Sequence, residues 1–96
     1  MAEEKIELSA PPDVEAQGGT EILRLFICDG ALSLSMQRAF ENPAMWGQLM
    51  AELAMQIAEV YARETDLAAS EALADIRASL DAAFVRIEAG AGAAFN

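Results

Sequence analysis

The sequence predicts an α+β domain in which an antiparallel β-hairpin, at about residues 21–37, precedes two α-helices packed on one sheet face, at about 43–64 and 70–89. Three features predict this fold: an Asp-Gly pair between two apolar segments, an Asn-Pro pair that opens a long amphipathic segment, and a second such segment ending at Gly90. An Asp-Gly pair favours a two-residue type I′ turn, and apolar residues at spacings of three and four favour helices.

The Asp29-Gly30 turn fixes the register of the hairpin, because a two-residue loop places the flanking residues directly opposite each other. One face is then wholly apolar, with the pairs Leu23–Met36, Leu25–Leu34 and Ile27–Leu32. The other face is mixed, with the pairs Arg24–Ser35, Phe26–Ser33 and Cys28–Ala31. Turn chemistry and side-chain alternation therefore predict the same hairpin.

The first helix is predicted to begin with Asn42 as N-cap and Pro43 as its first residue. Its apolar positions are Trp46, Leu49, Met50, Leu53, Ile57, Val60 and Tyr61. Gly47 interrupts this helix at a cost of up to ~1 kcal/mol relative to alanine. We therefore expect another backbone to pass close to Gly47.

The second helix has candidate caps at Thr65, Asp66 and Ser70 and a natural stop at Gly90. Its apolar positions form a narrow seam of Leu73, Ile76, Leu80, Phe84 and Ile87. A seam of this width suits packing against one partner helix.

The 96 residues correspond to one domain, at 20–90, with a different segment at each end. Residues 1–19 are predicted to form an acidic flexible arm, because Pro11-Pro12 and Gly18-Gly19 disfavour regular structure there. The segment KIEL at 5–8 is too short to be assigned as a strand. Residues 91–96 are predicted to be a frayed tail.

Six basic and sixteen acidic side chains give a net charge of −10, and the five arginines are spread singly along the chain. This charge argues against binding to nucleic acid or to an anionic membrane, since both require clustered cations. The single cysteine excludes an intramolecular disulfide, and the N-terminus lacks the features of a signal peptide. No apolar run approaches 18 residues, so we expect a cytoplasmic protein without a membrane span.

Histidine is absent, which removes Ser-His-Asp and Cys-His constellations and the commonest transition-metal ligand. The acidic residues form no calcium loop, and the helical methionines are spread around the circumference. We therefore predict no catalytic residue, no cofactor and no metal. For Cys28, a small residue packed beside the turn is favoured over a redox or inter-subunit thiol.

The mixed face of the hairpin is too apolar to be simple solvent surface, and a two-stranded sheet alone is marginal. We predict that Ile22, Arg24, Phe26 and Cys28 form a candidate interaction face. A second copy of the chain, pairing its strands across a two-fold axis, would give a four-stranded sheet and a homodimer. The alternative is that the arm at 1–19 folds over this face.

The order of features from residue 18 to residue 62 resembles a family of small bacterial proteins classed only as a domain of unknown function. The matching features are Gly-Gly-Thr-Glu at 18–21, Asp29-Gly30, Arg38-Ala39-Phe40 and Trp46-Gly47. The resemblance implies a compact α+β domain. It carries over no catalytic or ligand-binding residue.

Two functional classes remain open. The first is a non-catalytic, homodimeric protein–protein interaction or regulatory module that binds through a sheet edge or a helix groove. The alternative is a small-molecule-binding protein or minor enzyme with a pocket near Trp46, Tyr61 and Arg24. The missing histidine and the few convergent polar groups favour the first class.

Overall fold

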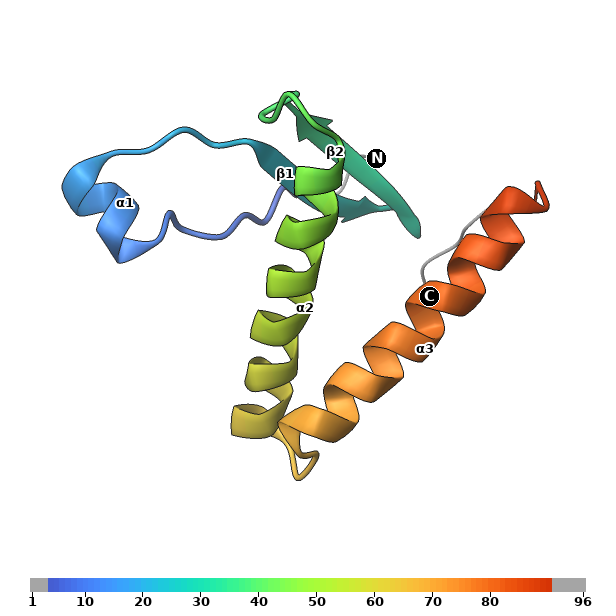
Figure 1. Cartoon of the computed structure of the whole chain (residues 1–96). Coiled ribbons are helices and arrows are strands. Elements are labelled where there is room, and N and C mark those ends of the chain that lie inside the picture. The colour runs from blue at the N-terminus through green and yellow to red at the C-terminus, as the bar shows by residue number, and fades with distance from the viewer. Residues whose placement is uncertain (1–3, 91–96) are drawn as a thin grey trace.

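The computed structural model describes residues 4–90, and its hairpin and two long helices occur in the predicted order (Figure 1). The elements are α1 (Pro12–Gln17), β1 (Leu23–Cys28), β2 (Ala31–Met36), α2 (Ala44–Glu64) and α3 (Ala69–Glu88). The α+β fold class is confirmed, and the ends of the hairpin and long helices lie within two residues of the prediction. The tail predicted at 91–96 lies outside the described residues.

The hairpin has the register that the Asp-Gly turn predicts. All six predicted pairs are present, from Leu23–Met36 at the open end to Cys28–Ala31 at the turn. Asp29 and Gly30 have φ angles of 55° and 75°, as a type I′ turn requires. Pairing continues one step beyond the strands, because the N–H of Gln37 donates to the carbonyl of Ile22 at 3.0 Å.

The start of α2 confirms the predicted Asn-Pro signal. The Asn42 Oδ1 accepts a hydrogen bond of 3.0 Å from the N–H of Ala44. Pro43 already has helical angles, with φ −54° and ψ −26°. The side chain of Asn42 therefore satisfies one of the N–H groups that the first turn leaves without a helical partner.

The connection from α2 to α3 is organised by Thr65. Its hydroxyl donates to the carbonyl of Tyr61 at 2.7 Å and accepts from the N–H of Leu67 at 3.1 Å. The next helix begins at Ala69, because the Glu71 Oε1 accepts from the N–H of Ala68 at 3.3 Å. Ser70, a predicted cap, therefore lies inside the first turn of α3.

The two long helices meet at the 65–68 connection and diverge from it as a V (Figure 1). Strand β1 contacts β2, and α2 contacts α3, but no contact joins either strand to either long helix within residues 4–90. The predicted packing of helices on the sheet face is therefore not made within a single chain. The helices contact each other near their connection and separate beyond it, so they do not form one surface over the hairpin.

The interior of the chain is small as a consequence. Among the described residues, the buried ones are Ala58 of α2 and Ala72 of α3, which lie on the two facing helices. The apolar sheet face is about half exposed: Leu25 49%, Ile27 58%, Leu32 43%, Leu34 46% and Met36 55%. A single chain therefore leaves most of its large apolar side chains in contact with water.

Gly47 lies in open space within the described chain. A Cβ atom built on Gly47 would have no other heavy atom within 4 Å beyond its own helix. The expected close passage of another backbone is thus wrong for the single chain.

The arm contains one short helix, contrary to the expectation that Pro11-Pro12 and Gly18-Gly19 disfavour regular structure there. Helix α1 occupies the six residues Pro12–Gln17 between Pro11 and Gly18, and none of its residues is buried. The flexibility predicted for the arm stays a prediction. None of the described helices combines the length and apolar character of a membrane span.

Candidate functional site

The predicted interaction face lies along β1 and the residue before it. Ile22 precedes the strand, and Arg24, Phe26 and Cys28 alternate along it opposite Ser35, Ser33 and Ala31. Ile22 and Phe26 are half-buried, whereas Arg24 and Cys28 are exposed. The four residues share one side of the hairpin, as their spacing requires. Their role in binding stays a prediction.

Arg24 is the electrostatic centre of this face. Its Nε donates to the Glu21 Oε2 at 3.1 Å, and its Nη1 donates to the Glu7 Oε2 at 3.1 Å. The hydrogen bond and charge of Glu21, supported by Glu7, raise the pKa of Arg24 above its already high ordinary value. The guanidinium therefore already binds two carboxylates, and it joins Glu7 to Glu21 instead of offering a free site for an anion.

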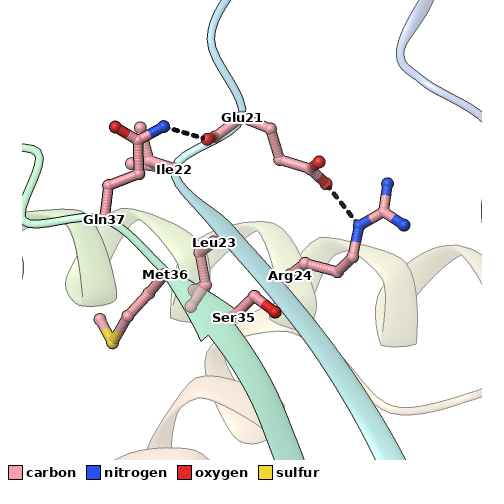
Figure 2. Close-up of a pocket in the computed structure, with 7 residues that line it drawn as sticks. All are labelled: Glu21, Ile22, Leu23, Arg24, Ser35, Met36 and Gln37. Carbon is pink, nitrogen blue, oxygen red and sulfur yellow. Dashed lines mark hydrogen bonds and ion pairs between the residues drawn. The ribbon is translucent and has the colours of Figure 1, made fainter.

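Figure 2 shows the hydrogen bonds of Glu21 at the open end of the hairpin, one to Gln37 and one to Arg24. The Gln37 Nε2 donates to the backbone carbonyl of Glu21 at 2.9 Å, while the Glu21 side chain reaches Arg24. A small hollow of about 210 Å³ lies here, between the ends of the two strands. The hydrogen bonds fix the end of the hairpin and leave little room for a ligand.

The arm lies beside β1. Residues Ile6, Glu7 and Leu8 line one hollow together with β1 residues that include Arg24 and Phe26. Lys5 adds a contact of 3.7 Å to Glu7. The arm therefore reaches the predicted face through charge, whereas its apolar side chains stay outside, with Ile6 84% and Leu8 97% exposed.

A further hollow lies between α2 and α3, where the two helices diverge. It has a volume of about 610 Å³ and contains the polar side chains of Asp75 and Ser79. Its apolar lining includes Ile57, Tyr61, Leu67, Ile76, Leu80 and Ala83. We call this hollow the α2/α3 groove.

The predicted pocket near Trp46, Tyr61 and Arg24 is not assembled in the described chain. Tyr61 lines the α2/α3 groove, and Arg24 is held by the arm and Glu21. Trp46 is fifteen residues before Tyr61 on the same helix, which separates them by roughly 22 Å at 1.5 Å per residue. The Trp46 ring instead packs edge-on against Phe40, with centroids 5.5 Å apart.

Sequence reasoning missed the partners of Arg24. Glu21 is three residues away, but Glu7 is seventeen residues away in an arm with no predicted structure. Neither spacing is a known signal for a strand residue. Within residues 4–90, no group of three or more Cys, Asp or Glu side chains has an arrangement that could hold a metal ion.

Comparison with known protein families places the chain in a family of small domains. The chain belongs to the family described as "Domain of unknown function (DUF5076)", whose model matches residues 7–86. The family resemblance noted for residues 18–62 is thereby confirmed and extends over both helices. No curated protein matches the chain.

A solved structure is similar to the chain over most of the length of both. It is described as the structure of a "putative pyruvate dehydrogenase" from the photosynthetic bacterium Rhodopseudomonas palustrus CGA009. The two chains are 40% identical, the match covers 84% of each, and the TM-score is 0.68. The relative is therefore a chain of similar length with the same fold.

Proposed function

We propose that the protein is a non-catalytic, homodimeric protein–protein interaction or regulatory module. The observation that carries this proposal is the lack of a core: only Ala58 and Ala72 are buried in the described residues. A compact chain of 10.2 kDa would expose roughly 5,300 Å², whereas this chain exposes 8359 Å². The extended arm accounts for part of this excess, and half-exposed apolar side chains account for another part.

The exposed apolar surface is of the size that a stable interface needs. Nineteen large apolar side chains of the described residues are more than a third exposed, and most of them lie on the hairpin and long helices. A standard interface buries ~800 Å² per partner, and part of this exposed apolar surface could supply that area. Burial against a second copy would stabilise both copies at once, because each has the same surface without a cover.

The small-molecule alternative has one observation in its favour, the α2/α3 groove. Its volume of about 610 Å³ is within the range of ligand sites, and Asp75 and Ser79 could orient a ligand. The groove is nevertheless open and mainly apolar, as expected for a surface that receives another helix or strand. We therefore rank a protein partner before a small ligand.

The description of the solved relative does not change this ranking. Pyruvate is a small carboxylate anion, and its binding calls for a cation or N–H groups directed into a pocket. Arg24, the one arginine of the predicted face, is already held by Glu7 and Glu21. A net charge of −10 also repels anions.

We propose a reducing, cytoplasmic location, which would keep the exposed Cys28 as a thiol.

Sedimentation velocity of the full chain tests the proposal. We expect a dimer of about twice 10.2 kDa at micromolar concentration, measured at moderate salt so that the repulsion between two acidic copies is screened. A 10.2 kDa monomer at every concentration up to 100 micromolar would contradict it. Addition of pyruvate should leave the sedimentation and the thermal transition unchanged, whereas a shift in either would favour the ligand-binding alternative.

A further inference from the structure

We propose that the two copies join through the free edge of β2, which pairs antiparallel with the same strand of a second copy. This inference rests on the homodimer proposed above and specifies its interface. We call the line along which the two β2 strands pair the β2 seam. The result would be a four-stranded sheet in the order β1-β2-β2-β1, with its two-fold axis at Leu34.

The first argument is the difference between the two edges of the hairpin. All six residues of β2 are exposed, whereas Leu23 and Phe26 of β1 are half-buried. The β1 side is accompanied by the arm, and Glu7 is bound there to Arg24. The edge of β2 is therefore the more accessible of the two within the described residues.

The second argument is that β2 lacks the features that protect natural edge strands. Such edges carry charged residues, proline or bulges, which prevent pairing with another chain. Strand β2 reads Ala-Leu-Ser-Leu-Ser-Met, without charge, proline or bulge, and pairs with β1 in regular register. In a chain of net charge −10, this charge-free strand is also where two copies can approach with the least repulsion.

The hydrogen-bond pattern shows which backbone groups are free. The Gln37–Ile22 bond marks a hydrogen-bonded pair, and alternate pairs back to the turn share that type, including Arg24–Ser35 and Phe26–Ser33. The intervening residues direct their N–H and C=O groups to the outer edge. These residues are Leu32, Leu34 and Met36.

The same three residues determine the register between copies. Leu34 opposite the partner's Leu34, and Leu32 opposite the partner's Met36, pair all the outward backbone groups. The apolar faces of the two hairpins then form one continuous surface, since a shift by one residue would place leucine beside serine.

Charge exchange across the seam tests the register. Ser33 lies opposite the partner's Ser35 on the face away from the leucines, and both serines are exposed. The variant Ser33→Lys/Ser35→Lys places like charges opposite each other twice, and we expect its dimer dissociation constant to rise about tenfold or more. The matched variant Ser33→Glu/Ser35→Lys places opposite charges there, and we expect it to dimerise at least as well as the natural chain.

A distance measurement tests the geometry without relying on any substitution. Cys28, the only cysteine, is exposed and can carry a spin label in the otherwise natural chain. Three strand spacings of about 4.8 Å and six residues of about 3.4 Å place the two Cys28 Cα atoms roughly 25 Å apart. Label distances should centre near this value, with allowance for the label arms.

The outcomes separate this inference from the proposal on which it rests. A dimer with label distances beyond roughly 40 Å, or one that Ser33→Lys/Ser35→Lys does not weaken, would overturn the β2 seam and leave the homodimer standing. A monomer for the natural chain would overturn both. Substitutions of Leu34 test whether its outward N–H is needed. Leu34→Pro removes this N–H and should abolish the dimer, whereas Leu34→Thr keeps the N–H and should retain more of the dimer.

Discussion

Glu7 and Arg24, seventeen residues apart, are joined by a 3.1 Å contact between Oε2 and Nη1. This ion pair connects the acidic arm with the first residues of β1. Glu21 binds the same guanidinium, because the Arg24 Nε donates to the Glu21 Oε2 at 3.1 Å. The position of the arm beside the hairpin therefore depends on charge, because its apolar residues Ile6 and Leu8 remain exposed.

Glu7→Gln should loosen the arm. The variant weakens a solvent-exposed ion pair, whose effect on the whole domain is small, but this pair joins residues 4–10 to the hairpin by a hydrogen bond. We expect hydrogen exchange in α1 to become about two- to fivefold faster, with the exchange of α2 unchanged. Glu59→Gln removes the same charge from α2 and is the control. Equal exchange of α1 in the natural chain and in Glu7→Gln would show that the arm is held by other contacts.

Gly30→Ala should destabilise the hairpin. Gly30 has φ 75°, where a Cβ atom costs roughly 1–2 kcal/mol. Asp29, with φ 55°, is the neighbouring turn residue, and asparagine tolerates this conformation well. Urea unfolding should therefore show a loss of about 1–2 kcal/mol for Gly30→Ala and almost none for Asp29→Asn. A neutral Gly30→Ala would mean that the turn is not type I′ in solution.

The hairpin was predictable to the level of individual pairs, because its determinants are local. A two-residue turn with Asp29 and Gly30 permits one register, and the alternation of Leu25 with Phe26 selects the same one. The start of α2 was predictable for a similar reason, since the Asn42 side chain accepts a hydrogen bond from Ala44, only two residues further along the chain. The cap of α3 was not, because the Glu71 carboxylate accepts from the N–H of Ala68 and Ser70 lies inside the first turn.

The relative placement of the elements was less accessible. The sequence shows that Leu25 and Leu34 need a cover, but not whether the helices of the same chain supply it. Trp46 and Tyr61 both read as apolar helical positions, and their spacing of fifteen residues on one helix already places them too far apart for one pocket. The Glu7–Arg24 contact was missed because it joins segments without shared periodicity. Long-range contacts depend on packing, which local patterns do not encode.

Ala68→Ser should stabilise α3. Ala68 has the extended angles of an N-cap, φ −71° and ψ 150°, and its N–H already donates to the Glu71 carboxylate. A serine hydroxyl at this position can accept from the N–H of Glu71 and so complete the capping box. We expect a gain of about 1 kcal/mol in the free energy of unfolding. Ala82→Ser, at an exposed position in the middle of α3, should instead reduce stability slightly, and a loss in both variants would contradict this geometry.

Gly47→Ala measures whether anything covers the beginning of α2. Within the described chain a Cβ on Gly47 meets no atom within 4 Å, so alanine should stabilise the helix by about 0.5–1 kcal/mol. For a domain of this size the melting temperature should rise by roughly 2–8 °C. Ala51→Gly, one turn later at an exposed position, should lower stability by a similar amount.

The effect of Gly47→Ala on the dimer dissociation constant also tests where the second copy lies. A seam at β2 leaves the surface around Gly47 open, so the dimer dissociation constant of Gly47→Ala should equal that of the natural chain. If Gly47→Ala folds stably but dimerises more weakly, the backbone of the partner passes close to Gly47, where the missing Cβ leaves room for it. In that case the two copies would contact each other through α2, and the β2 edge would remain available to a different protein.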